Sequence, residues 1–341
     1  MRFLWVKEWR NERRNESPKQ GQNAGQMWLR KKSHITIIFI VTKETITMNF
    51  GLVAHRLHRL GPDSSLLRWA RACEPGLRAL GLSLHATGGA YDALSKYKLL
   101  DGQLHPVGNG RDGGLMRLVS RMAGGLAPQA ALDGVFFLID PVDPTSIYPE
   151  AQALKRQCVI HGKPFASTLA GAMEWVAVEL TNAGLHTLCV PETAPLFALE
   201  SQVAALVAHD ALKDQMVAFA AEHFDTLSRF AGRVATGTTG KRLNEMAWSR
   251  GWPQTQPWVT CYQSGPLGGD AQIAELVLDQ RCQKVIFFED PHVARQHEAD
   301  IQLLERAVCS AHHATTCFNT PAMARRWAQA VVRGLGGPAR S

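Results

Sequence analysis

Residues 203–210 read Val-Ala-Ala-Leu-Val-Ala-His-Asp, and residues 49–56 read Asn-Phe-Gly-Leu-Val-Ala-His-Arg. Each stretch is an apolar run of the length of a buried strand, and each ends on a histidine followed by a charged residue. The two histidines, His55 and His209, are 154 residues apart. The match indicates that one structural unit occurs twice in the chain.

Three later motifs follow in the same order in both copies. In the second copy they read Ala-Thr-Gly-Thr-Thr-Gly (235–240), Ser-Gly-Pro-Leu-Gly-Gly-Asp (264–270) and Phe-Phe-Glu-Asp-Pro (287–291). In the first copy they read Ala-Thr-Gly-Gly-Ala (86–90), Asn-Gly-Arg-Asp-Gly-Gly-Leu (109–115) and Phe-Phe-Leu-Ile-Asp-Pro (136–141). The offset between copies drifts by a few residues, as loop insertions between matched elements would cause. The chain therefore holds a duplicated unit that keeps its polar side chains in the second copy.

Short apolar runs alternate with stretches of helical apolar spacing through the second copy. Strands are expected at 202–208, 233–236, 258–262, 284–288 and 315–318, and helices at 211–230, 239–250, 268–281, 299–311 and 321–333. This alternation is typical of α/β proteins. Because the first copy follows the same order, we expect two tandem Rossmann-like domains. Each should hold a mostly parallel five-stranded sheet with helices on both faces.

The repeat also sets the expected domain boundaries. The first domain is expected at 49–180, the second at 202–335, and the connection between them at 181–201. This connection is too apolar for a free linker, so the two domains are expected to pack together. Residues 1–48 differ from the rest in composition, and we expect a disordered or non-native extension there, with translation beginning at Met48.

The net charge of +7 comes almost entirely from residues 1–48, which hold ten Lys or Arg and four Glu. The other 293 residues carry 27 basic and 26 acidic side chains, so nucleic acid is not an expected partner. The apolar run at 35–41 is far short of the roughly 20 residues that span a bilayer, and no membrane partner is expected. Seven cysteines without a CxxC pair favour a reducing compartment, and we expect a cytoplasmic protein.

The second copy's motifs fall at the carboxyl ends of expected strands, where α/β folds place ligands. Thr236 to Gly240 open a helix, so their N–H groups and hydroxyls suit a phosphate or carboxylate. Asp270 follows two glycines at a helix start, which favours its ionised, proton-accepting form. Taken singly, each motif is more commonly a helix cap, but their ordered occurrence at strand ends favours one shared site.

On these motifs, residues 202–320 closely resemble methylglyoxal synthase. Enzymes of that family convert dihydroxyacetone phosphate to methylglyoxal and inorganic phosphate without a metal or organic cofactor. The resemblance implies that Asp270 is the catalytic base, that His297 lies near the substrate carbonyl and that Asp300 belongs to the catalytic set. It also implies a set of substrate-binding and phosphate-binding residues, which are His209, Lys213, Thr236, Gly237, Thr238, Thr239, Ser264 and Gly265. Asp210 and Asp290 are implied as further acidic residues of the site.

The same resemblance implies dihydroxyacetone phosphate as substrate, inorganic phosphate as product and inhibitor, and a homo-oligomer. The family's C-terminal phosphate-binding Arg has no aligned counterpart here, which leaves Arg326, Arg333, Arg340 or an Arg of the first copy as candidates. Two alternatives remain open. One alternative to methylglyoxal synthase is a non-catalytic sensor of a phosphorylated ligand, because this domain type also resembles regulatory domains of carbamoyl phosphate synthetase. The other is an enzyme that acts on a different small phosphorylated ketone.

The first copy resembles the same domain without its acid–base groups. Leu115 stands at the position of Asp270, and Ile147 at that of His297. An alkyl side chain cannot accept a proton, so no catalysis is expected there. The first copy is then either an anion-binding domain, through His55 and its neighbours, or a structural partner that replaces a neighbouring subunit.

Overall fold

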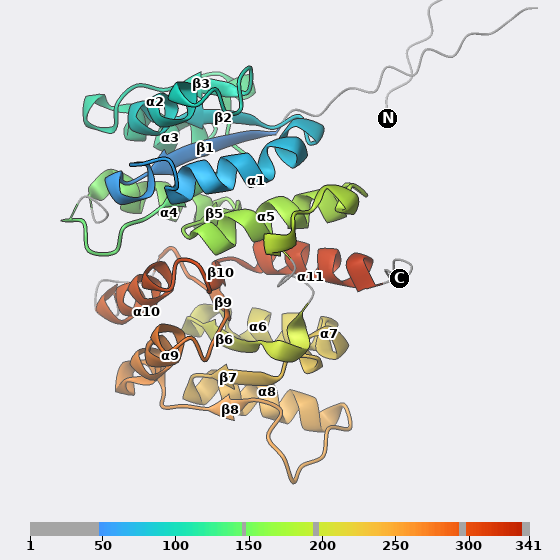
Figure 1. Ribbon diagram of the computed structural model, residues 1–341. Helices are drawn as coiled ribbons and strands as arrows, with labels where there is room; N and C mark the ends of the chain where they lie inside the picture. The colour runs from blue at the N-terminus through green and yellow to red at the C-terminus, as the bar shows by residue number, and fades with distance from the viewer. Residues whose placement is uncertain (1–47, 145–147, 194–197, 293–297, 336–341) are drawn as a thin grey trace, which may run out of the picture. The chain divides into compact units, whose positions relative to one another are not determined.

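The computed structural model describes residues 48–144, 148–193, 198–292 and 298–335, which form two five-stranded sheets (Figure 1). The first sheet consists of β1 (Asn49–Ala54), β2 (Ser83–Ala86), β3 (Leu104–Pro106), β4 (Gly134–Leu138) and β5 (Phe165–Ala166). The second consists of β6 (Val203–Ala208), β7 (Gly232–Ala235), β8 (Thr260–Cys261), β9 (Lys284–Phe288) and β10 (Thr316–Phe318). We call the two halves the first and the second repeat.

Both sheets have the same topology. All pairings are parallel, and the strand orders are β3-β2-β1-β4-β5 and β8-β7-β6-β9-β10. The central strands are therefore β1 and β6, the two runs that end on His55 and His209. The predicted fold class, two tandem Rossmann-like units with five-stranded parallel sheets, is confirmed.

Helices connect the strands in both repeats. The first repeat contains α1 (Ser65–Ala79), α2 (Gly88–Lys96), α3 (Gly114–Met122), α4 (Pro149–Ile160) and α5 (Leu169–Asn182). The second contains α6 (Lys213–Glu222), α7 (Phe224–Ser228), α8 (Gly237–Ser249), α9 (Gly269–Leu278), α10 (Glu298–Ser310) and α11 (Pro321–Leu335). The single helix predicted over 211–230 is interrupted at His223, whose backbone angles (φ −112°, ψ 29°) are not helical.

The two repeats share one hydrophobic core. It covers one face of each sheet and includes Trp69 of α1, Trp175 of α5 and Trp327 of α11. The opposite faces have separate cores, one under α3 and α4 and the other under α9 and α10. The prediction that the two halves pack together is thus confirmed.

Helix α5 lies at the centre of this contact. Figure 1 shows α5 and α11 side by side between the two sheets, and the two helices pack against each other. Nearly every residue of α5 from Leu169 to Thr181 is buried, as expected for a helix that is enclosed on all sides. Within the described ranges, no helix is both long and apolar enough to cross a membrane.

Candidate active site in the second repeat

His209 lies at the carboxyl end of β6. Its backbone N–H donates to the Phe288 carbonyl at 3.1 Å, and its ring packs edge-on against Phe287. The Asp290 N–H donates to His209 Nδ1 at 2.7 Å. Since Nδ1 is an acceptor, the neutral imidazole carries its proton on Nε2. The fold therefore fixes His209 as a hydrogen-bond donor through Nε2.

Asp210 and Lys213 follow directly on the same segment. A 3-10 turn, Asp210–Leu212, leads into α6, which begins at Lys213. The Lys213 ammonium pairs with the Asp210 carboxylate, and the Lys213 side chain is 16% exposed while that of Asp210 is 93% exposed. The cation is thus held near the strand end, with its stem shielded from solvent.

The Thr/Gly motif forms the N-terminus of α8. Gly237 N–H donates to the Gln263 carbonyl at 2.9 Å, and a Cβ on Gly237 would lie 3.0 Å from Ser264 N. This close approach places the start of α8 against the loop that leads to Asp270. Thr238 is exposed, whereas Thr239 is fully buried and its hydroxyl has no partner in the part of the chain that the structure describes. Because the N–H groups of Gly237 and Gly240 already donate to backbone carbonyls, the first-turn N–H groups of α8 that suit an anion are those of Thr238 and Thr239.

Two glycines shape the loop before Asp270. Gly268 has φ +94°, and a Cβ on Gly269 would lie 1.9 Å from the Gln263 carbonyl oxygen. Helix α9 begins at Gly269, so Asp270 lies in its first turn. A Cβ on Gly265 would lie 2.8 Å from Asp270 Oδ2. The carboxylate is therefore held against the bare Gly265 backbone at a helix N-terminus, where negative charge is favoured.

These contacts bring the predicted residues together in pairs at one edge of the sheet. His209 meets Asp290, Asp210 meets Lys213, the start of α8 meets Ser264, and Gly265 meets Asp270. All lie at the carboxyl ends of β6 to β9, the edge where open parallel sheets bind ligands. His297 lies outside the described residues, and Asp300 is described only as part of the α10 backbone.

Comparison with known proteins gives a consistent result. No protein-family model matches this chain. A methylglyoxal synthase from Thermus thermophilus is 46% identical to it over 108 residues, which cover 32% of this chain and 78% of that protein. The chain belongs to the methylglyoxal synthase family. A methylglyoxal synthase from Clostridioides difficile is 40% identical over 130 residues, 38% of this chain and 87% of that protein.

A solved structure gives a match of similar extent. The crystal structure of methylglyoxal synthase from Elizabethkingia anophelis matches 41% of this chain and 80% of its own, at 32% identity and a TM-score of 0.31. The matched lengths of the Thermus and Clostridioides proteins, 108 and 130 residues, are close to the length of one repeat.

Sequence reasoning missed the residues that hold the site's loops. The Gln272 side chain accepts a hydrogen bond from Gln263 N–H at 3.0 Å, which ties α9 to the loop before Ser264. Glu289, next to Asp290, pairs with Lys155 of the first repeat. The Glu in the Phe-Phe-Glu-Asp-Pro motif was the available signal for Glu289, because the first copy has an isoleucine there.

The first repeat keeps the backbone of the site but covers it with its own side chains. His55 Nδ1 accepts from Asp140 N–H at 2.9 Å, as His209 does from Asp290. A Cβ on Gly88 would lie 2.0 Å from Asn109 Oδ1, and one on Gly89 would lie 2.6 Å from the Arg59 guanidinium carbon. The N-terminus of α2 is thus occupied by the side chains of Asn109 and Arg59.

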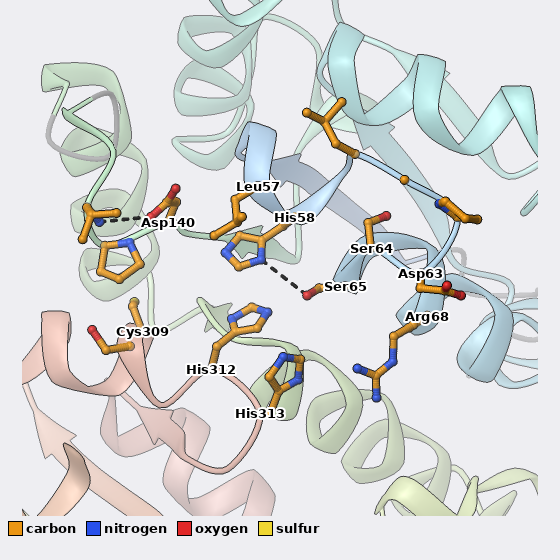
Figure 2. Close-up of a pocket in the computed structure, with 16 residues that line it drawn as sticks. Leu57, His58, Asp63, Ser64, Ser65, Arg68, Asp140, Cys309, His312 and His313 are labelled. Atoms are coloured by element: carbon orange, nitrogen blue, oxygen red, sulfur yellow. Dashed lines mark hydrogen bonds between the residues drawn. The ribbon is translucent and has the colours of Figure 1, made fainter. Parts of the chain in front are cut away.

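A cavity of about 710 Å³ lies between the start of α1 and the turn after α10, and Asp140 of the first repeat is among the residues that line it (Figure 2). The rings of His58 and His312 stack there with centroids 4.1 Å apart. His58 Nε2 donates to the Ile139 carbonyl at 2.9 Å, and His312 Nδ1 accepts from Leu169 N–H at 3.3 Å. Burial lowers the pKa of both imidazoles, that of His312 to about 3.

The histidines of this cavity serve the packing of the repeats. His58 Nε2 and His312 Nδ1 already bind backbone groups of the first repeat, and His58 Nδ1 lies 3.4 Å from Ser65 Oγ. Among the residues that the structure describes, no group of three or more His, Cys, Asp or Glu side chains could hold a metal ion. The cavity is therefore separate from the candidate site around Asp270.

Proposed function

We propose that the second repeat is a methylglyoxal synthase that converts dihydroxyacetone phosphate to methylglyoxal and inorganic phosphate. The observation that carries this proposal is the placement of the Asp270 carboxylate, against Gly265 and at the N-terminus of α9, beside the N-terminus of α8. A proton acceptor and an anion-binding helix start then lie at the same sheet edge. Family membership supports the same assignment.

The first step needs a base and a donor. In the proposed reaction, the Asp270 carboxylate removes a proton from the carbon that bears the substrate hydroxyl. The electron pair moves to the neighbouring carbonyl, and an enediolate forms. A hydrogen-bond donor aimed at the developing oxyanion lowers this barrier. His209, whose proton lies on Nε2, is a described donor at this edge, and the family resemblance adds His297.

The second step breaks the carbon–oxygen bond to phosphate. The hydroxyl proton passes to the leaving phosphate, the electrons of that O–H bond form an aldehyde carbonyl at the hydroxyl-bearing carbon, and the carbon–carbon double bond shifts to expel inorganic phosphate. The enolate that remains takes up, on its terminal carbon, the proton held by Asp270, and this gives methylglyoxal. In the proposed site the Lys213 ammonium and the first-turn N–H groups of α8 stabilise the departing phosphate.

Arg326, Arg333 and Arg340 are the candidates to replace the C-terminal phosphate-binding arginine of the family. Arg326 pairs with Glu179 of α5, and Arg333 donates to the Asn182 carbonyl at 2.6 Å. Both candidates on α11 therefore bind the first repeat, and Arg340 lies outside the described residues. We propose that Lys213 is the principal cation for the phosphate and that the first repeat, over 49–180, is a structural partner of a catalytic repeat over 202–335.

The test is an assay of the full chain with dihydroxyacetone phosphate. We expect equal yields of inorganic phosphate and of methylglyoxal trapped as an adduct, and loss of both products in Asp270→Asn. Folded protein that binds dihydroxyacetone phosphate without turnover would favour the non-catalytic sensor. Release of phosphate from a different small phosphorylated ketone would keep the site and change the substrate.

A further inference from the structure

Two consecutive side chains of α4, in the first repeat, contact the loop that follows β9 in the second. The Lys155 ammonium lies 2.9 Å from Glu289 Oε2. Arg156 Nε donates to the carbonyl oxygen of Pro291 at 2.9 Å. Because Asp290 lies between Glu289 and Pro291 in the chain, the two contacts flank it on both sides.

The Lys155 contact is well shielded from solvent. The side chains of Lys155 and Glu289 are 12% and 10% exposed, and Lys155 also pairs with Glu305 of α10 at 3.0 Å. Burial disfavours the ammonium, but the two carboxylates outweigh it and raise the pKa of Lys155. The Asn319 amide donates to the other oxygen of Glu289. Both oxygens of the Glu289 carboxylate are therefore fixed.

The segment held in this way orients His209. Asp290 N–H donates to His209 Nδ1 at 2.7 Å, and Asp290 Oδ1 accepts from His292 N–H at 2.9 Å. Any displacement of residues 289–291 would move the N–H group that sets the His209 tautomer. Contacts to the partner of a functional imidazole commonly set its orientation and basicity.

The two repeats carry different side chains at the equivalent positions of this contact. Lys155 of α4 and Glu305 of α10 occupy equivalent positions, each directly after a buried leucine, Leu154 or Leu304. If the two repeats were identical, two lysines or two glutamates would face each other here, and like charges repel. In this chain the lysine of the first repeat, Lys155, faces the glutamate of the second, Glu305. At the position of Glu289 the first repeat has Ile139, which offers no carboxylate to bind.

We propose that α4 of the first repeat is a positioning element for the site of the second. Lys155 holds the side chain of Glu289 and Arg156 holds the backbone of Pro291, so both neighbours of Asp290 are fixed, and Asp290 in turn fixes the imidazole of His209. Neither residue touches the substrate. As far as turnover is concerned, this inference rests on the proposed function, whereas the orientation of His209 can be measured without it.

The experiment uses the full chain, four variants to be compared, and His209→Asn to assign the spectrum. Lys155→Met removes the cation, and Lys155→Arg restores one. A triple variant, K155M/E289Q/E305Q, removes the cation without leaving buried carboxylates unpaired. The matched control is Lys163→Met, because Lys163 lies just beyond α4 but donates to the Leu132 carbonyl within the first repeat.

The first readout is the histidine ¹⁵N spectrum, with the His209 signals assigned by their loss in His209→Asn. The parent, Lys155→Arg and Lys163→Met should show a single His209 tautomer with the proton on Nε2. Lys155→Met and the triple variant should show a mixture of tautomers. The second readout is kcat/KM for dihydroxyacetone phosphate, which should fall about 10- to 100-fold in the same two variants, mainly through kcat.

The outcomes separate the two proposals. If Lys155→Met folds and keeps both the parent tautomer and the parent kcat/KM, the inference is overturned. Where Lys155→Met does not fold, the triple variant decides by the same criteria. If the parent itself shows no turnover, the proposed function fails, and the ¹⁵N spectra alone decide whether α4 positions His209.

Discussion

Lys284 on β9 of the second repeat forms an ion pair with Glu174 on α5 of the first, and both side chains are almost completely buried. Trp327 Nε1 also donates to Glu174 Oε1, at 3.0 Å. Burial lowers the pKa of Lys284, although the Glu174 carboxylate opposes this effect. An almost completely buried charge pair therefore joins the two repeats.

Removal of the carboxylate should destabilise the whole chain. In Glu174→Ala the Lys284 ammonium and the Trp327 N–H would lose a buried acceptor, and breaking a buried ion pair costs about 3–5 kcal/mol. We expect a loss of this size in the free energy of unfolding, measured in urea. The control is Glu74→Ala, which breaks the partly exposed pair with Arg78 and the hydrogen bond from Leu100 N–H, and should cost about 1–2 kcal/mol.

A second variant separates the charge from the packing. In the double variant E174L/K284M both charged groups are replaced by apolar side chains, so neither is left unpaired. Such replacements are often neutral or stabilising, and we expect most of the lost stability to return. Equal losses in Glu174→Ala and Glu74→Ala would show that the buried pair contributes no more than a surface one.

The fold could be predicted because the local pattern and the repeat agree. Apolar runs that end on His55 and His209 became the central strands of two identical topologies. The interruption of the helix at His223 was not predictable, because apolar spacing continues across it. The strand predicted at 258–262 is limited to Thr260–Cys261, since only these residues pair with β7.

The sheet edge at which these motifs lie could also be predicted, but the contacts that support the candidate site there could not. The motif order placed Asp270, His209 and the Thr/Gly turn at one sheet edge. The contact of Lys155 with Glu289 and Glu305 joins different repeats, and Lys155 and Glu305 are 150 residues apart in the chain. Only the packing of the repeats sets which side chains meet across that distance, and no local pattern contains this information.

Gly265→Ala should lower turnover with little loss of stability. The added Cβ would lie 2.8 Å from Asp270 Oδ2, so the carboxylate, which is the mobile end of its side chain, has to move. A misplacement of about 1 Å can reduce the rate roughly 100-fold. Steady-state kinetics on dihydroxyacetone phosphate would measure the effect. The control is Gly110→Ala, the equivalent position in the first repeat, where nothing lies within 4 Å of the new Cβ.

The two equivalent histidines should differ in their importance for turnover. Asparagine in place of histidine keeps an oxygen acceptor near Nδ1 and removes the Nε2 donor. We expect His209→Asn to reduce kcat about 100-fold, the effect of removing one donor to a developing oxyanion. His55→Asn removes the same groups beside Asp140 and should leave kcat unchanged. Similar losses in both variants would indicate that the first repeat also binds substrate.

His312 should make folding sensitive to acid. Burial, followed by the nearby His58, His313 and Arg68, lowers the pKa of its imidazole to about 3, whereas that of an unfolded histidine is about 6.5. Between these values the unfolded chain binds a proton that the folded chain does not, so stability falls as pH falls. The slope from this group is about 1.4 kcal/mol for each pH unit below 6.5.

His312→Asn, which keeps an acceptor for Leu169 N–H, should lose less stability between pH 6.5 and pH 5 in urea titrations than the parent. The exposed His161 provides the control, and if His161→Asn flattened the pH dependence as much as His312→Asn, the burial of His312 would not be its cause.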